Sequence, residues 1–130
     1  MIIDGKNAIL GRLAAYVAKE ALKGEEIAIV NCEQIVITGN KEFIKNKLEG
    51  KRKRLGTALM GPKVSRTNEK IVKRTIRGML PNYRVGRGRI AFKRIKCYVG
   101  IPKEFNDKKM ESFEGKTKGK KTQVKEFAKW

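Results

Sequence analysis

The pattern of apolar and polar positions along the first part of the chain predicts alternating strands and helices. Met1 to Ile3 is a short apolar run, which favours a strand. After the turn Asp4–Asn7, apolar residues recur at spacings of three and four. This repeat indicates an amphipathic helix that Asn7 caps and that ends near Lys23-Gly24. The apolar positions of this helix are Leu10, Leu13, Ala14, Val17, Ala18 and Ala21.

Two β-branched runs and a second helix follow. Ile27 to Val30 and Ile35 to Ile37 are short for helices, so we predict buried strands. Thr38-Gly39-Asn40 is a turn whose asparagine caps a helix from Lys41 to about Leu48. The expected apolar face of this helix consists of Phe43, Ile44 and Leu48. The order strand, helix, strand, strand, helix predicts an α/β domain with a largely parallel sheet.

The periodicity weakens after Gly50, and residues 56–64 are predicted to be a loop. A third helix is predicted over residues 68–80, and Pro81 ends it. Its inward positions are Ile71, Val72, Ile76, Met79 and Leu80, and its outward positions are Lys70, Lys73, Arg74 and Arg77. Residues 90–95 are predicted to be helical, and Cys97-Tyr98-Val99 to be the last strand.

These elements form one expected domain over residues 1–102. Residues 103–130 form a basic C-terminal extension with few core residues. We expect part of this extension to become ordered only on its partner. The alternative is that Val124, Phe127 and Trp130 pack at helical spacing.

Charge is distributed unevenly along the chain. The 32 Lys and Arg residues outnumber the 13 Asp and Glu residues, and the net charge is +19. Residues 1–40 carry four basic and five acidic residues, residues 41–96 nineteen and three, and residues 97–130 nine and five. The middle segment therefore supplies most of the excess. Because such a charge opposes compaction unless a polyanion neutralises it, we expect nucleic acid as the partner, with an anionic membrane surface as the second choice.

The remaining composition argues against membrane, metal and common catalytic functions. Apolar runs span only a few residues, and the start lacks the regions of a signal peptide, so we expect a cytosolic protein without a membrane span. The chain has no histidine and only two cysteines, Cys32 and Cys97. These are too few ligands for a structural zinc site, and a histidine-based triad is excluded. We expect both cysteines to be reduced and mostly buried thiols.

Two glycine patterns approach nucleotide-binding motifs without matching them. In Gly5–Arg12, five residues separate the glycines where the Walker pattern has four, and no Lys-Ser or Lys-Thr follows. Gly86–Ala91 fits the letters of a dinucleotide fingerprint, but it comes after Pro-Asn-Tyr-Arg rather than an apolar strand. We interpret the first pattern as an ordinary strand-to-helix turn and expect no nucleotide cofactor and no small-molecule substrate.

Two cationic stretches are candidate RNA-binding segments. Lys51–Arg54 is a run of four cations whose mutual repulsion indicates a partner rather than a merely solvated face. Arg77–Arg89 combines arginine with glycine and has no acidic residue. Glycine lets backbone N–H groups approach phosphate, arginine grips phosphate bidentately, and Tyr83 offers a face for an unstacked base. A flexible solvated loop is the alternative. The predicted RNA-binding residues are Lys51, Arg52, Lys53, Arg54, Lys63, Arg66, Lys73, Arg74, Arg77, Tyr83, Arg84, Arg87, Arg89 and Arg94.

Three stretches carry a resemblance to a known family. They are GRLAAYVAKEALKGEEIAIVNCEQIVITGNK (11–41), GPKVSRTNEKIVKRTIRGMLP (61–81) and GRGRIAFKRIKCYVGIP (86–102), and Arg77–Pro81 is the most specific motif. In order and spacing they resemble the universal large-subunit ribosomal protein thirteen family. Gly-Pro-Lys before the third helix and Gly-Ile-Pro near the end are closer to its archaeal and eukaryotic branch.

The resemblance implies a three-layer α/β/α domain with a mostly parallel sheet of about four strands. It also implies a structural, non-enzymatic protein of the large ribosomal subunit in the cytoplasm, with large-subunit ribosomal RNA and neighbouring ribosomal proteins as partners. Two rival functions stay open. A chromatin-type DNA-binding protein would have the same composition. A nucleotide-dependent enzyme on a Rossmann-like sheet is disfavoured by the incomplete glycine motifs and the absence of histidine.

Overall fold

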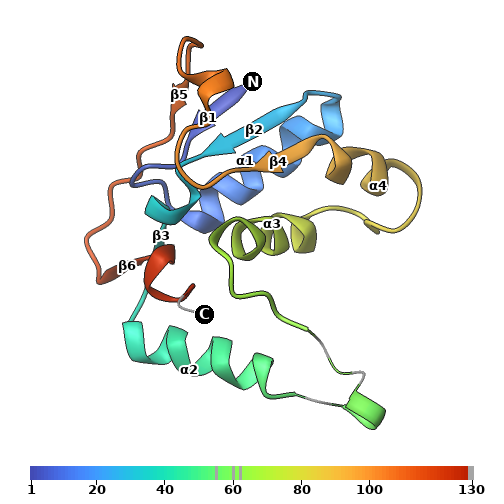
Figure 1. Cartoon of the computed structure of the whole chain (residues 1–130), viewed down its shortest axis with the longest axis vertical. Coiled ribbons are helices and arrows are strands. Elements are labelled where there is room, and N and C mark those ends of the chain that lie inside the picture. Colours follow the sequence, from blue (N-terminus) through green and yellow to red (C-terminus); the bar gives the residue numbers. More distant parts are fainter. Residues whose placement is uncertain (55, 60, 62, 129–130) are drawn as a thin grey trace.

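A computed structural model of the whole chain describes residues 1–54, 56–59, 61 and 63–128 (Figure 1). The helices and strands of these residues are, in chain order, β1 (Ile2–Asp4), α1 (Leu10–Lys23), β2 (Ile27–Val30), β3 (Val36–Thr38), α2 (Lys41–Arg52), α3 (Asn68–Met79), α4 (Gly86–Lys93), β4 (Ile95–Cys97), β5 (Glu111–Ser112) and β6 (Lys121–Gln123). Single 3-10 turns are η1 (Cys32–Gln34), η2 (Thr57–Leu59), η3 (Lys103–Phe105) and η4 (Val124–Glu126).

Four strands form one parallel sheet in the order β4-β2-β1-β5. Ile3 pairs with Ile29, and Ile27 pairs with Ile95, across neighbouring strands. All four isoleucines are buried in one apolar cluster with side chains of α1, α3 and α4. The α/β class and the mostly parallel sheet of about four strands are thereby confirmed.

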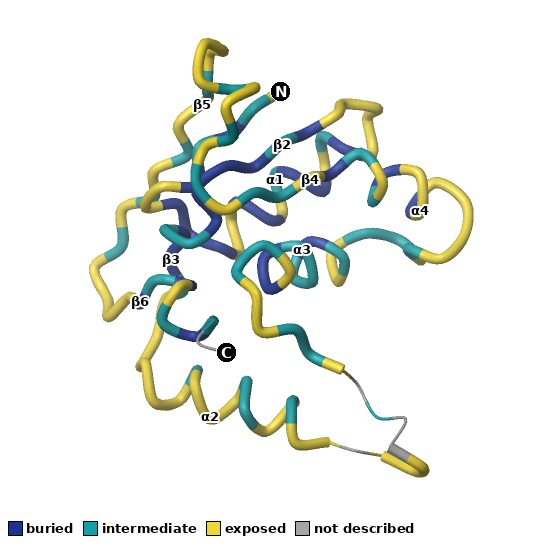
Figure 2. Tube along the Cα trace, in the orientation of Figure 1, coloured by how far each residue is buried: buried dark blue, intermediate teal, exposed yellow. Residues whose placement is uncertain are grey.

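Helices α1, α3 and α4 cover one face of this sheet, and the segment around Tyr98 and η3 lies over the other. Because side chains alternate along a strand, Ile2, Ala28 and Lys96 lie on the face opposite the buried isoleucines. On the core face, α1 packs against both α3 and α4 (Figure 2). On the other face, Tyr98 and Phe105, whose ring centroids are 5.5 Å apart, line a hollow with those three residues. The second face therefore has only a thin covering around η3.

The start of α1 differs from the predicted cap. Ile9 precedes the helix and makes no side-chain cap bond, whereas Asn7 lies in the turn with a left-handed backbone (φ 55°). Gly5 determines this turn, because a Cβ there would lie 2.9 Å from the carbonyl oxygen of Val30. The glycine lets the chain pack against the end of β2, so Gly5–Arg12 is an ordinary strand-to-helix turn, as predicted.

The third strand and the second helix are present, but their surroundings differ from the prediction. The run Ile35–Ile37 leads into β3, which pairs antiparallel with β6 in a separate two-stranded sheet rather than joining the parallel one. Asn40 caps α2 as predicted, since its side-chain oxygen accepts a hydrogen bond from the N–H of Glu42 at 3.2 Å. The predicted apolar face of α2 is only partly covered, because Ile44 and Leu48 are half-buried, none of the helix's residues is buried, and Phe43 is 67% exposed.

Helix α3 follows its predicted pattern except at the end. Ile71, Val72 and Ile76 are buried, whereas Met79 is 44% exposed. The helix ends at Met79, and Leu80 adopts an extended conformation and packs against the core instead. The last inward position is therefore Leu80 rather than Met79.

Helix α4 and strand β4 begin earlier than predicted. The helix expected over residues 90–95 starts at Gly86 and ends at Lys93. The strand expected from Cys97 to Val99 instead begins at Ile95 and ends at Cys97. Ile95 belongs to the strand because it pairs with Ile27 and is buried in the core.

Residues 103–128 fold back onto the domain in the isolated chain. Strand β5 adds to the sheet beside β1, and β6 pairs with β3. Val124 is fully buried and Phe127 is only 5% exposed. The predicted packing of these two side chains is therefore observed, and Trp130, which was predicted to pack with them, lies outside the described residues. No helix in the described residues is long and apolar enough to cross a bilayer.

Candidate nucleic-acid interface

The connection between α3 and α4 is a packed turn rather than a flexible loop. Gly88 is buried, and a Cβ at this position would collide with the carbonyl oxygens of Pro81 and Asn82. The side-chain oxygen of Asn82 accepts a hydrogen bond from the N–H of Arg84 at 3.1 Å. Gly86 has a left-handed backbone (φ 61°), which turns the chain into α4. Glycine thus permits close packing here, which argues against the alternative of a flexible solvated loop.

This turn gathers predicted site residues around the ring of Tyr83. The guanidinium carbon of Arg77 lies 4.5 Å from the ring centroid, and that of Arg84 lies 5.4 Å from it. Arg84 also donates from Nε to the Tyr83 hydroxyl at 3.2 Å. Phe92 of α4 is tilted against Tyr83 with centroids 6.1 Å apart, and Lys73 of α3 lies 4.8 Å above the Phe92 ring. Cation–π contacts therefore connect α3, the turn and α4.

Arg84 and the neighbouring arginines shift the pKa of Tyr83. Its pKa is lowered from the ordinary value by the hydrogen bond from Arg84 and, further, by the charges of Arg84, Arg77 and Arg74. Arg77 covers part of the Tyr83 ring within the chain itself. Guanidinium planes also stack on unpaired bases.

The turn arginines Arg84, Arg87 and Arg89 form no ion pair with an acidic residue in the part of the chain that the structure describes. Arg84 is exposed, and so are Arg87 and Arg89 in the first turn of α4. The ion pairs formed by the described residues involve Lys23 and Lys41, neither of which belongs to this surface. We call this surface the turn cluster; it consists of Lys73, Arg74, Arg77, Tyr83, Arg84, Arg87 and Arg89.

In the basic run Lys51–Arg54, three residues are exposed and Arg52 is hydrogen-bonded within the chain. Lys51 and Arg52 are the last residues of α2, and Lys53 and Arg54 follow. Arg52 donates from Nη2 to the carbonyl oxygen of Phe127 at 3.2 Å and to that of Ser65 at 3.5 Å. Burial, and then the charge of Arg66, lowers the pKa of the Arg52 guanidinium. Arg52 is therefore committed to backbone carbonyls within the chain.

A second exposed surface remains after Arg52 is set aside. We call it the arm surface; it consists of Lys51, Lys53, Arg54, Lys63 and Arg66, all of which are exposed. In Figure 1 the end of α2 and the segment that follows it lie well apart from the turn between α3 and α4. The structure thus brings the predicted residues together as two surfaces rather than one.

Arg94 has a structural role within the chain. Its Nη1 donates to the carbonyl oxygen of Ala21 at 3.2 Å, in the last turn of α1. Gly24 ends that helix with a left-handed backbone (φ 112°). The same carbonyl oxygen also accepts the N–H of Gly24, so Arg94 adds a second donor at the helix C-terminus, where a cation complements the helix dipole.

Sequence reasoning missed cations outside the predicted set. Lys45 and Lys47 are exposed on α2, and the Lys41, Lys45 spacing of one helical turn was a visible signal. Residues 103–128 are called the C-terminal segment below. Arg12 and Lys120 line a shared hollow between α1 and this segment. No local signal predicts that pair, because only the return of the C-terminal segment brings them together.

The structure offers no support for the cofactor motifs. Val85, an extended residue outside any strand, precedes the Gly86–Ala91 pattern, so the strand that a dinucleotide fingerprint requires is missing. Among the residues that the structure describes, no group of three or more potential ligands could hold a metal ion.

Comparison with known proteins identifies the family. A family model described as Ribosomal protein L13 matches residues 1–104. The chain belongs to this ribosomal protein family. The large ribosomal subunit protein uL13 of Methanocaldococcus jannaschii is 52% identical over 105 residues, which cover 78% of this chain and 76% of that protein. The uL13 protein of Methanosphaera stadtmanae is 46% identical over 116 residues, which cover 87% of this chain and 81% of that protein.

Membership of the L13 family confirms the predicted resemblance, and these archaeal relatives agree with the predicted branch. It also confirms that the protein belongs with large-subunit ribosomal proteins and not with enzymes. The family match includes the turn cluster and the arm surface but ends before most of the C-terminal segment.

Proposed function

We propose that the protein binds large-subunit ribosomal RNA and fixes the relative positions of RNA segments in the cytoplasmic ribosome. The turn cluster is the observation that carries this proposal. Its cations are exposed or half-buried, lie beside one another on α3, the turn and α4, and have no acidic partners among the described ion pairs. Such a surface repels itself until phosphates neutralise it.

The geometry favours phosphate contact and shape recognition over reading of a base sequence. The arginines emerge from a turn that Gly88 and Asn82 hold in place, so their positions are set before binding. A planar guanidinium matches two phosphate oxygens and can also stack on an unpaired base. We assign phosphate contacts to the arginines and lysines of the turn cluster and the arm surface, and stacking to Tyr83 with Arg77.

Two members of the predicted set take another role in this proposal. Arg52 and Arg94 donate to carbonyl oxygens of Phe127 and Ala21, so they position the helices that carry the binding surfaces. Neighbouring large-subunit proteins are the further expected partners. The family argues against a chromatin protein, and the missing strand before Gly86 argues against a nucleotide-dependent enzyme.

Fractionation of native ribosomes over a series of salt concentrations tests the proposal. We expect the protein to sediment with the large subunit and to leave only at high salt, because contacts to phosphate weaken as salt rises. Sequencing of the RNA that crosslinks to the protein should return large-subunit ribosomal RNA. Recovery of most of the protein free, or on DNA, at moderate salt would contradict the proposal.

A further inference from the structure

Helix α2 lacks the usual means of holding a helix to its domain. None of its side chains is buried, and Figure 2 shows it as an exposed or half-exposed rod at the edge of the molecule. Most helices in proteins are held by packing of an apolar face rather than by helix propensity. The arm surface begins on this helix, so whatever orients α2 also orients those cations.

The C-terminal segment is anchored firmly on the domain beside α2. Strand β6 pairs with β3, with Thr122 opposite Ile37. The N–H of Val124 then donates to the carbonyl oxygen of Ile35 at 2.8 Å, and the Val124 side chain is fully buried in the core. The turn η4 is therefore fixed to the domain, and it carries Phe127 just after it.

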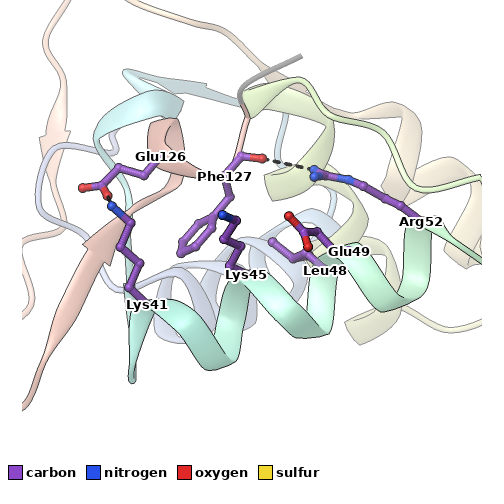
Figure 3. Close-up of a pocket in the computed structure, with 7 residues that line it drawn as sticks. All are labelled: Lys41, Lys45, Leu48, Glu49, Arg52, Glu126 and Phe127. Carbon is purple, nitrogen blue, oxygen red and sulfur yellow. Dashed lines mark hydrogen bonds and ion pairs between the residues drawn. The ribbon is translucent and has the colours of Figure 1, made fainter.

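Residues of this anchored turn contact α2 in both the first and the last turn of the helix (Figure 3). Glu126 forms an ion pair with Lys41 in the first turn of the helix. The carbonyl oxygen of Phe127 accepts the hydrogen bond from Arg52 in the last turn. Between these contacts, Phe127 lines a cavity of about 240 Å³ together with Lys45, Leu48 and Glu49 of α2. The helix is thus held along one side by residues of the C-terminal segment.

Arg52 joins a third part of the chain to the same point. Its Nη2 also lies 3.5 Å from the carbonyl oxygen of Ser65, in the connection that leads to α3. Lys63 and Arg66 belong to that connection. One guanidinium therefore links the end of α2, the C-terminal segment and the chain that carries the rest of the arm surface.

We propose that residues 121–127 act as a clamp that sets the direction of α2 and thereby positions the arm surface on RNA. Arg52 and Glu126 are its positioning residues, and neither needs to touch RNA. The effect on RNA rests on the proposed function, whereas the clamp itself is a property of the free protein. The family match ends at residue 104, so the clamp lies outside the part of the chain that the family model covers.

The first test measures α2 in the free protein by hydrogen exchange. Arg52→Gln removes the guanidinium contacts to Phe127 and Ser65 together with one charge, and its matched control Arg54→Gln removes one charge from an exposed residue two positions later. We expect α2 amides to exchange at least about tenfold faster in Arg52→Gln than in Arg54→Gln, while exchange of α1 amides stays unchanged. The reason is that α2 would open locally more often without global unfolding of the domain. Equal protection of α2 in both variants would overturn the proposal.

A second variant covers the event that Arg52→Gln fails to fold. Glu126→Gln leaves Val124 and Arg52 in place and removes the ion pair with Lys41. We expect the first turn of α2 to exchange faster while α1 and α3 keep their protection. Unchanged exchange in a folded Glu126→Gln protein would count against the clamp.

RNA binding then separates the clamp from the proposed function. With a large-subunit RNA fragment that the unaltered protein binds, Arg54→Gln should flatten the salt dependence of log affinity by about 0.7–0.9, the loss of one phosphate contact. Arg52→Gln should weaken binding more than Arg54→Gln, because it disperses the whole arm surface. If α2 loosens in Arg52→Gln but neither variant changes RNA binding, the clamp stands and the arm surface is not an RNA contact. If Arg54→Gln weakens binding and α2 stays protected in Arg52→Gln, the clamp is wrong and the RNA function stands.

Discussion

Cys32 and Cys97, which are distant in the sequence, both lie beside Ile29 of β2 in the folded chain. Cys97 ends β4 and pairs with Ile29 of β2, and the thiol of Cys32 lies 3.6 Å from the carbonyl oxygen of the same Ile29. Both cysteines are free; Cys32 is buried and Cys97 is half-buried. The hydrogen bond with Cys97, together with burial, raises the pKa of the Cys32 thiol above its ordinary value.

The two thiols should therefore differ in reactivity. We expect an alkylating reagent to modify Cys97 well before Cys32 in the native protein, because the thiolate is the nucleophile and Cys32 forms it less readily. Peptide mapping by mass spectrometry over time measures the order, and modification of both thiols in denaturant is the control. Faster modification of Cys32, or an intramolecular disulfide in the protein as isolated from its cell, would contradict this prediction.

The turn arginines should set the salt dependence of RNA binding. Changing Arg84, Arg87 and Arg89 together to alanine should flatten the plot of log affinity against log salt by roughly two units, since each phosphate contact contributes about 0.7–0.9. Circular dichroism should show an intact fold, because all three side chains are exposed. The matched control changes the exposed Lys6, Lys19 and Lys23 to alanine and should leave the slope nearly unchanged. A folded triple arginine variant with an unaltered slope would show that the turn cluster is not the RNA contact.

Charge placed on the inner face of α1 should unfold the protein. Leu13 and Val17 are fully buried, so Leu13→Asp or Val17→Asp forces an unpaired carboxylate into the core at a cost of several kcal/mol. Arg12→Asp on the exposed side of the same helix is the control and should melt cooperatively near the unaltered temperature. Cooperative melting of Leu13→Asp at that temperature would be inconsistent with the described core.

Two glycines close together in the chain should respond oppositely to alanine. Gly88→Ala drives a Cβ into the carbonyl oxygens of Pro81 and Asn82, and we expect a loss of about 1–3 kcal/mol in the free energy of unfolding. Gly78 lies within α3 with no atom near its Cβ position, so Gly78→Ala should stabilise the protein by roughly 0.5–1 kcal/mol. Denaturant titration of the free protein compares them. Equal stability of the two variants would refute the packed turn.

The pKa of Tyr83 should depend on Arg84 more than on other turn arginines. Removal of the hydrogen bond in Arg84→Met destabilises the phenolate, so the lowered pKa should rise toward the ordinary value of 10.0. Tyrosinate absorbance during alkaline titration, taken as the difference from Tyr83→Phe, isolates this ring from Tyr16 and Tyr98. Arg87→Met is the control. If the pKa of Tyr83 rises more in Arg87→Met than in Arg84→Met, Arg84 is not the main cause of the lowered pKa.

Local sequence patterns predicted the elements whose neighbours are near in the chain. The spacing of Leu13 and Val17 predicted the inner face of α1, and Ile71 and Ile76 did the same for α3. Such patterns do not predict which strands or side chains from distant parts of the sequence pack together. The run Ile35–Ile37 has a clear strand signal but no sign that it pairs with Lys121–Gln123, whose residues are polar.

The candidate site shows the same division at the level of single side chains. Composition predicted that the segment from Arg77 to Arg89 is a cationic surface, and the structure places its residues together. Composition does not reveal which arginine serves a backbone carbonyl, because that depends on where Phe127 and Ala21 arrive after folding. Arg52 and Arg94 were therefore grouped with the exposed arginines that they resemble in sequence.

The pairing of β3 with β6 sets an order of events during synthesis. Strand β3 is made early, but its partner consists of residues 121–123, after every other described strand. Until those residues emerge, one edge of β3 offers unpaired backbone groups to any passing strand, and the core lacks Val124. The earlier elements can assemble first, so the closing step belongs to the newest part of the chain. A nascent chain stalled before residue 121 would be the form most exposed to mispairing.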